Sequence, residues 1–185
     1  MTSLTSWTSW TARSAGVLAR TRVPLGFLGG AVALWLAHPT WRSLAAGAAV
    51  AALGEAIRVW AAGHLEKGRE VTRSGPYRWT AHPLYLGSAV IALGIIVSGR
   101  SLALAVLVAA YVLLAIGGAI RNEQAELRAA FGREYDDYLA GNQAAAAGGV
   151  RRFSLARAFR NREYRAVAGI LAALALFALK ARLML

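Results

Sequence analysis

Polar and aromatic residues gather at residues 73–87, RSGPYRWTAHPLYLG, directly before an apolar run. The Gly-Pro pair predicts a turn, and Pro83 suits the first turn of a helix, where its missing N–H would have no partner anyway. His82 then caps this helix, whose free backbone N–H groups can hold a carboxylate or another anion. Tyr77 and Tyr85 add two aromatic faces, each with a hydroxyl group. The segment predicts either a ligand-binding site at the start of a helix or an interfacial turn anchored by aromatic residues.

A second polar cluster lies at residues 121–138, RNEQAELRAAFGREYDDY. Glu123, Leu127 and Phe131 are spaced by four residues and therefore share one face of a helix. Glu123 either presents its carboxylate to a ligand or pairs with a neighbouring arginine on a solvated surface. The spacing alone leaves both alternatives open.

A helical hairpin is expected to bring the two clusters together. Apolar runs at residues 84–97 and 102–120 flank a tight turn at residues 98–100. Two helices joined by such a short turn run antiparallel. The open end of the hairpin therefore places residues 82–85 beside Glu123, so that a carboxylate, an imidazole and tyrosines converge there.

The composition predicts that these elements lie in a membrane. Hydrophobic residues make up 57% of the 185 residues and charged residues 16%, with a mean hydropathy of +0.45, whereas soluble domains carry about 25% charged residues. A spanning helix needs about 20 mostly apolar residues. Apolar runs occur at residues 23–37, 44–62, 84–97, 102–120 and 166–179. The fold class expected is all-α, a polytopic membrane protein of about five transmembrane helices with a cytoplasmic helical extension.

The chain is expected to divide into four regions. Residues 1–22 form an N-terminal arm, and residues 23–140 form a membrane core with spans at about 23–38, 44–62, 83–98 and 101–121. Residues 141–165 form a linker and a basic interfacial helix. Residues 166–185 form a C-terminal apolar helix, whose run is short enough for a tilted span, a re-entrant segment or a buried core helix.

The charges predict orientation and exclude several classes of site. With five spans, 16 of the 21 Lys and Arg residues fall on the side of the N-terminus, which places the N-terminus and the long loops in the cytoplasm. The net charge of +12 then reflects topology, and no nucleic-acid partner is expected. The absence of cysteine excludes disulfides and thiolate chemistry. The three histidines are far apart, so no metal site is expected.

The two clusters together resemble the isoprenylcysteine carboxyl methyltransferase family and the related phospholipid methyltransferases. The resemblance rests on SGPYRWTAHPLYLG, followed about 40 residues later by E-x-x-x-L-x-x-x-F-G-x-x-Y-x-x-Y, and it covers roughly residues 63–138. These families are small integral-membrane enzymes. The resemblance implies transfer of a methyl group from S-adenosylmethionine to a lipid or a lipophilic small-molecule acceptor, with the cofactor site on the hairpin at the cytoplasmic side.

The resemblance also implies which residues form the site. Those implied to bind the cofactor are Val71, Thr72, Tyr77, His82, Pro83, Leu84, Tyr85 and Glu123. The set extends upstream to His64, Lys67, Arg69 and Glu70, and Arg121 is a candidate for binding the acceptor. The resemblance assigns no catalytic residue. It implies a location in a membrane, which in a bacterium is the cytoplasmic membrane, and membrane lipids as partners. It does not predict the oligomeric state.

Three positions depart from the family pattern. Ala81 stands where the family usually has arginine, and Gln124 replaces the second acid of a glutamate pair. Ala119 replaces an arginine that helps to hold a substrate carboxylate in the eukaryotic enzymes, which argues against a prenylcysteine carboxylate as acceptor. The alternatives are a nicotinamide-dependent membrane reductase related to sterol reductases and a non-catalytic membrane scaffold.

One further pair of charges lies inside an apolar run. Glu55 and Arg58 are three residues apart and share a helical face. A buried pair of this kind either neutralises itself for structural reasons or belongs to a substrate path. We favour the structural interpretation.

Overall fold

The computed structural model describes residues 28–141 and 151–184. The chain divides into two compact units, residues 1–36 and 37–185. Residues 28–36 of the first unit are helical. The expected N-terminal arm, residues 1–22, and most of the expected linker lie outside the described residues.

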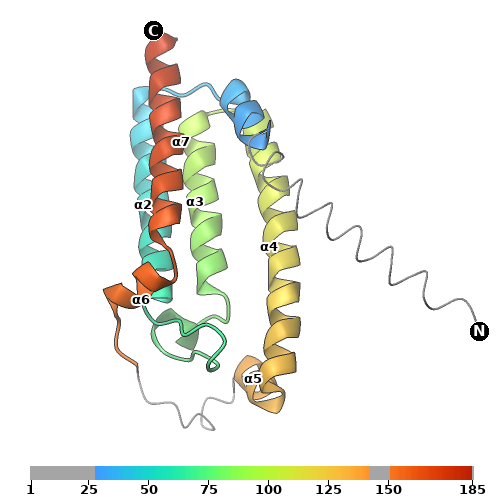
Figure 1. Ribbon diagram of the computed structural model, residues 1–185. Coiled ribbons are helices and arrows are strands. Elements are labelled where there is room, and N and C mark those ends of the chain that lie inside the picture. The colour runs from blue at the N-terminus through green and yellow to red at the C-terminus, as the bar shows by residue number, and fades with distance from the viewer. Residues whose placement is uncertain (1–27, 142–150, 185) are drawn as a thin grey trace, which may run out of the picture. The chain divides into compact units, whose positions relative to one another are not determined.

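The second unit is built from helices (Figure 1). They are α2 (Trp41–Ala62), the short 3₁₀ helix η1 (Gly75–Arg78), α3 (Pro83–Gly99), α4 (Leu102–Phe131), α5 (Arg133–Leu139), α6 (Leu155–Arg160) and α7 (Tyr164–Leu183). The described residues contain no strand. The all-α fold class is therefore confirmed.

Capping residues mark where α2 and α4 begin. The Thr40 hydroxyl accepts the Ser43 N–H at 3.3 Å, and the Ser43 hydroxyl accepts the Thr40 N–H at 2.9 Å, a reciprocal pair that satisfies two otherwise unpaired donors. At α4, the Ser101 hydroxyl accepts the Leu104 N–H. Arg100 lies between α3 and α4 in the left-handed conformation, with φ of 47°, and so completes the tight turn of the hairpin.

Glycines allow α2 and α3 to pack with their backbones in contact. Gly47 and Gly54 of α2 face Gly94 and Gly87 of α3, and all four are buried. A Cβ atom on Gly94 would lie 2.6 Å from the Ala51 nitrogen and from the Gly47 carbonyl oxygen. Small residues of this kind are how helices approach closely in a membrane, where apolar burial gives no driving force between them.

Three helices are long and apolar enough to cross a membrane: α2, α4 and α7. The α3 helix is apolar but has only 17 residues. The run at 166–179, for which shorter structures were considered, forms a continuous helix of 20 residues. About five spans therefore remain a prediction, because most of the first expected span lies outside the described residues.

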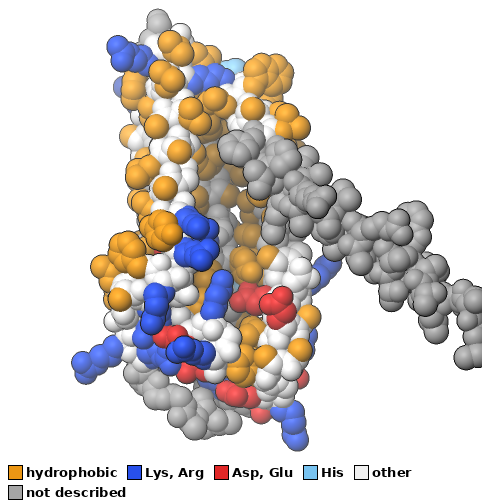
Figure 2. Space-filling model, viewed as in Figure 1, with side chains coloured by type: hydrophobic (Ala, Val, Ile, Leu, Met, Phe, Trp, Pro, Cys, Tyr) orange, Lys and Arg blue, Asp and Glu red, His pale blue; other side chains and the backbone are white. Residues whose placement is uncertain are grey.

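The surfaces of these helices suit contact with lipid. Only 6% of the most apolar window of α4 and 11% of that of α7 are buried, and Leu113 and Leu114 are more than 70% exposed. Figure 2 shows that charged side chains of both signs gather at the end of the unit that carries α5 and α6. The charged end adjoins the start of α3, where the sequence places the candidate site.

Candidate functional site

A pocket lies at this charged end, between the loop that follows α2 and the far end of α4. Its walls come from the loop, η1, α4 and α5, and they consist of Leu65, Glu66, Lys67, Gly68, Glu70, Val71, Thr72, Tyr77, Ala81, Glu123, Leu127, Tyr135 and Tyr138. Behind it, Val71, Tyr135 and Tyr138 form a buried cluster against which Ala81, Leu127 and Phe131 pack. The pocket thus combines an apolar floor with a few polar groups, the usual make-up of a small-molecule site.

The turn after α4 positions the two tyrosines of this cluster. Gly132 has a φ of +52°, a conformation that glycine adopts without steric cost, and the chain turns there into α5. Tyr138 then donates its hydroxyl to the Tyr77 carbonyl at 2.8 Å. The Arg73 guanidinium lies 5.5 Å from the centre of the Tyr138 ring and donates to the Glu134 carbonyl. These contacts fix α5 against the loop.

The tyrosine hydroxyls at the pocket are neutral donors at physiological pH. Burial raises the pKa of Tyr138 to about 12 and also raises the pKa of Tyr77 and of Tyr135. The Tyr135 hydroxyl is buried and has no hydrogen-bond partner among the described residues. An unpaired buried donor of this kind is costly, and a polar ligand in the pocket would satisfy it.

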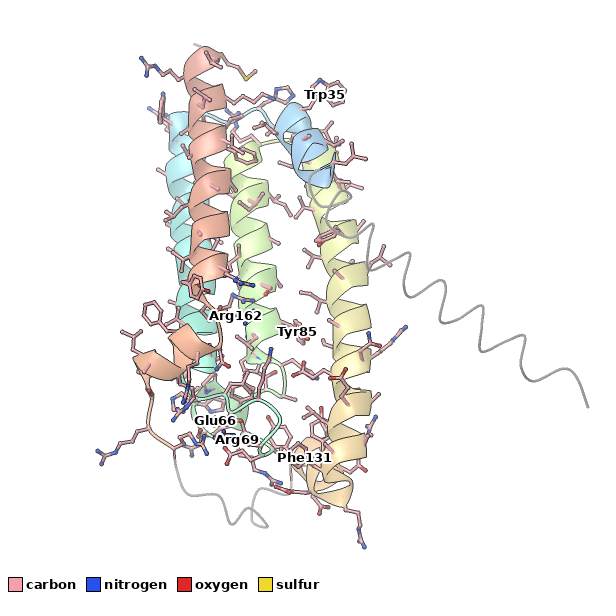
Figure 3. The ribbon with its side chains drawn as sticks, in the orientation of Figure 1. Trp35, Glu66, Arg69, Tyr85, Phe131 and Arg162 are labelled. Carbon is pink, nitrogen blue, oxygen red and sulfur yellow. The ribbon has the colours of Figure 1, made fainter. Side chains whose placement is uncertain are left out.

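His82 and Glu123 meet where α3 begins, as the hairpin geometry predicts. His82 Nδ1 lies 3.8 Å from Glu123 Oε2. Gln124 Nε2 lies 3.3 Å from His82 Nε2, and the Tyr85 ring centre lies 5.8 Å from that of His82. Figure 3 shows Tyr85 at the start of α3, on the side toward α4. Glu123 therefore has a histidine rather than an arginine beside it, since Arg128 pairs with Asp136 at 2.9 Å.

Burial lowers the pKa of His82, and the nearby Glu123 charge opposes this shift only in part. The imidazole is therefore neutral at neutral pH. Its Nδ1 atom is buried and has no hydrogen-bond partner in the described part of the chain. The site thus offers one further unsatisfied ring nitrogen next to a carboxylate.

The loop wall of the pocket is held by residues from the C-terminal part of the chain. Arg157 Nε lies 2.8 Å from Glu66 Oε1, and Arg151 pairs with Glu70 at 2.8 Å. The Asn161 side chain donates to the carbonyls of Ala62 and Leu65. Figure 3 shows Glu66 and Arg69 on this loop. The segment that the sequence predicts as a basic interfacial helix therefore also braces one wall of the pocket.

The structure separates the predicted site residues into three groups. Those that line the pocket are Lys67, Glu70, Val71, Thr72, Tyr77 and Glu123. His82 and Tyr85 do not line it, but they adjoin Glu123. Those that point elsewhere or take no part in its walls are His64, Arg69, Pro83, Leu84 and Arg121.

Two residues of the last group have other partners. His64 is buried and its Nδ1 atom lies 3.1 Å from the Ser74 hydroxyl. The Leu84 carbonyl accepts Arg58 Nη1 at 3.4 Å. Arg121 is exposed. His64 and Leu84 therefore contribute to the loop and to the start of α3 rather than to the pocket surface.

Tyr135 and Tyr138 line the pocket and belong to the motif E-x-x-x-L-x-x-x-F-G-x-x-Y-x-x-Y, but they are not among the predicted site residues. The signal was present: two aromatic residues three apart follow a glycine that ends a helix. Glu66 carried no comparable signal, because its arginine partners lie about 90 residues further along the chain.

We expect the folded state to lose stability as the pH falls below 6.5. Burial lowers the pKa of His64 and of His82 below that ordinary value, so the unfolded chain binds more protons in mildly acidic solution. The contribution of the two neutral histidines to stability is complete above about pH 6.5, and it is lost as the pH falls through their lowered pKa values in the folded state. Melting temperatures in detergent between about pH 8 and about pH 5 measure this. The double variant His64→Gln/His82→Gln should have a flatter profile; an unchanged profile would contradict the assignment.

Long apolar helices with exposed surfaces, and a partly polar pocket at one end of them, are the features of an integral membrane protein with a candidate binding site. The chain belongs to the phospholipid methyltransferase family, whose model matches residues 34–134, more than half of its length. No curated protein and no solved structure matches it. The matched region includes α2, α3 and most of the pocket lining, whereas α6 and α7 lie beyond it. The family is one of membrane methyltransferases that act on lipids, which favours that interpretation over a reductase.

Proposed function

We propose that this protein transfers a methyl group from S-adenosylmethionine to a lipid or a lipophilic small molecule. The observation that carries the proposal is the meeting of Glu123 and three tyrosines around one pocket, with His82 beside Glu123, at the open end of the α3–α4 hairpin. Family membership supports the reaction class. The chemistry of the residues around the pocket supports the cofactor.

The residues present fit that cofactor. The Glu123 side chain is 38% exposed, and its carboxylate accepts hydrogen bonds from ribose hydroxyls or from an ammonium group. The unpaired Tyr135 hydroxyl is a buried donor for a carboxylate or a ring nitrogen. Aromatic faces attract cations, and apolar Val71 and Leu127 suit a flat ring system. The cofactor's carboxylate, ammonium, sulfonium and adenine groups each find a suitable chemical partner.

S-adenosylmethionine supplies, when bound, a methyl group activated on a sulfonium for in-line displacement. The protein's own residues bind the cofactor and the acceptor and orient them toward each other. Fixing two reactants near attack distance contributes about 7–11 kcal/mol to catalysis. Glu123, Tyr77 and Tyr135 hold one end of the site, and the apolar cluster behind them excludes water.

The departures at positions 81 and 124 are compatible with binding. Ala81 packs against the cluster of Val71, Tyr135 and Tyr138, so no charged group is left buried at that position. Gln124 contacts the His82 ring, and this contact orients the imidazole beside Glu123. These contacts argue against a decayed site in a scaffold protein.

The site lies on the cytoplasmic side in this proposal, together with the N-terminus. The excess of Lys and Arg residues in the segments 1–22, 63–83 and 121–165 supports that orientation. The acceptor enters laterally from the bilayer. This route would be overturned if the protein methylated water-soluble acceptors efficiently and did not methylate apolar acceptors.

The test is calorimetric titration of the detergent-purified protein with S-adenosylmethionine. We expect saturable binding that weakens about tenfold or more in Glu123→Gln, because a hydrogen bond to a charged group contributes about 1.5–3 kcal/mol. Glu126→Gln is the matched control, since Glu126 is an exposed glutamate on the same helix and does not line the pocket. Absence of binding by a folded sample would discard the proposal. Binding of a nicotinamide dinucleotide instead would establish the reductase alternative.

A further inference from the structure

A crevice lies between α3 and α7, apart from the pocket described above. Its apolar lining comes from Ile91 and Ile95 of α3 and from Ile170 and Ala173 of α7. It has a volume of about 350 Å³, within the range of ligand pockets. A Cβ atom on Gly169, which also lines it, would meet no atom within 4 Å. The crevice is therefore open space along two apolar helices.

The arginine at the polar end of this crevice is paired within the protein. Arg58 and Ser88 line it, but the Arg58 guanidinium pairs with both carboxylate oxygens of Glu163, the shorter distance being 2.9 Å. It also donates to the Ser88 hydroxyl. The Arg58 guanidinium is therefore occupied by partners within the protein.

Two arginines at the base of α7 have no such partners. Arg162 and Arg165 are exposed, and neither forms an ion pair or a side-chain hydrogen bond with the described residues. By contrast, three other arginines of the same segment, Arg151, Arg157 and Arg160, pair with Glu66. The segment therefore contains a paired set of arginines that braces the loop and, beside α7, two arginines without an ionic partner among the described residues.

These two arginines lie at the end of the α7 face that lines the crevice. Arg165 precedes Gly169 by four residues and Ala173 by eight, so the three share one face of the helix. Figure 3 shows Arg162 at the base of α7, on the side of α3, and its left-handed φ of 65° is uncommon for a residue with a side chain. Arg165 and Ala173 are separated by about 12 Å along the helix axis. Cationic groups at one end of an apolar groove of this length match a phosphate with an attached acyl chain.

The expected position of the two arginines in the membrane is also consistent with binding of a phosphate headgroup. The α7 helix begins at Tyr164 and is long and apolar enough to cross a membrane. Arg165 therefore lies in its first turn and Arg162 just before it, where arginines reach the headgroup layer. The crevice continues from there along the apolar part of the helix.

We propose that the α3–α7 crevice binds one anionic phospholipid, with its phosphate on Arg162 and Arg165 and an acyl chain along Ile91, Ile95 and Ile170. Two guanidinium groups match a headgroup that carries net negative charge better than one whose choline cancels the phosphate charge. The site does not depend on methyl transfer, because none of these residues lines the pocket at Glu123.

The test compares two lipids with identical acyl chains, phosphatidylglycerol and phosphatidylcholine, on the purified protein. Lipid retained is counted by native mass spectrometry, and the melting temperature is followed as each lipid is titrated. We expect retention of one phosphatidylglycerol and a rise in melting temperature at lower concentrations than with phosphatidylcholine. The variant Arg162→Gln/Arg165→Gln should raise the half-saturating concentration of phosphatidylglycerol about tenfold or more.

Two further variants make the test specific. Arg133→Gln/Arg152→Gln removes the same charge from exposed positions outside the crevice and should retain lipid normally. Gly169→Leu fills the crevice without a backbone clash and should abolish retention with the arginines intact. Equal loss in the control, normal retention in Gly169→Leu, or equal affinity for the two lipids would each overturn the proposal.

Discussion

Replacing Gly94 by alanine should destabilise the protein by about 1–2 kcal/mol, and replacement by leucine should prevent α2 and α3 from pairing. The new Cβ atom would lie 2.6 Å from two backbone atoms of α2 and 2.9 Å from the Ala51 Cβ. Backbone atoms cannot rotate away as a flexible side chain can, so the two helices must separate. Overpacking of this kind typically costs about 1–3 kcal/mol, here against a gain in helix propensity of up to about 1 kcal/mol.

The matched control is Gly117→Ala in α4, where a Cβ atom meets nothing within 4 Å. That variant should be as stable as the natural protein or slightly more stable, because only the propensity changes. The stability of both variants is measured as the melting temperature in detergent and as the fraction of monodisperse protein that remains after heating. Equal behaviour of the two variants would show that the α2–α3 contact is not as close as described.

The Gly94 variant should also weaken the pocket, although Gly94 lies far from it along α3. The α2–α3 contact fixes α3, and the start of α3 places His82 beside Glu123 of α4. A helix displaced along its length shifts that end as well. We therefore expect the cofactor affinity of any residual folded Gly94→Ala protein to fall together with its stability.

Local patterns were sufficient to predict the hairpin. Two apolar runs, a tight turn and the spacing of Glu123, Leu127 and Phe131 place His82 beside Glu123, and the 3.8 Å separation confirms it. Each of these signals acts within one helix or one turn, where periodicity and chain length determine the geometry. The extent of α7 was harder to predict, because charged residues bound its apolar run at both ends while the helix continues beyond them.

Contacts between distant segments were not predictable in the same way. Glu163 pairs with Arg58 across 105 positions, whereas the spacing in the sequence indicates only Glu55 as a partner. An arginine in a basic segment could pair with any of several acidic residues, and the periodicity of the sequence does not indicate which one it contacts. The division of the C-terminal arginines into those that bind Glu66 and those without an ionic partner among the described residues therefore required the three-dimensional arrangement.

Removal of Arg58 should be among the most damaging single substitutions in the chain. Arg58 lies between two buried carboxylates, at 3.7 Å from Glu55 and 2.9 Å from Glu163, whose side chains are 12% and 9% exposed. Arg58→Ala leaves both without a cation. Breaking a buried pair in this way costs about 3–5 kcal/mol. We expect little folded protein in detergent, or a strongly lowered melting temperature.

A neutral replacement of the whole group distinguishes lost charge balance from lost packing. The triple variant Glu55→Gln/Arg58→Met/Glu163→Gln removes all three charges and keeps similar volumes, and it should recover most of the stability. Arg128→Ala is the control at an exposed pair, where Arg128 and Asp136 are more than half exposed and the cost should be below about 1 kcal/mol. A triple variant as unstable as Arg58→Ala would argue that the arginine acts through its hydrogen bonds to Ser88 and Leu84 instead.

The same variants decide between the structural role and a substrate path for Arg58. Arg58 does not line the pocket at Glu123, so the triple variant should bind S-adenosylmethionine with an affinity within about threefold of the natural protein. A structural role requires that stability falls in Arg58→Ala and returns in the triple variant, with methyl transfer following the amount of folded protein. If the triple variant is stable and binds the cofactor but transfers no methyl group, the charges belong to the path of the acceptor, and the structural interpretation is wrong.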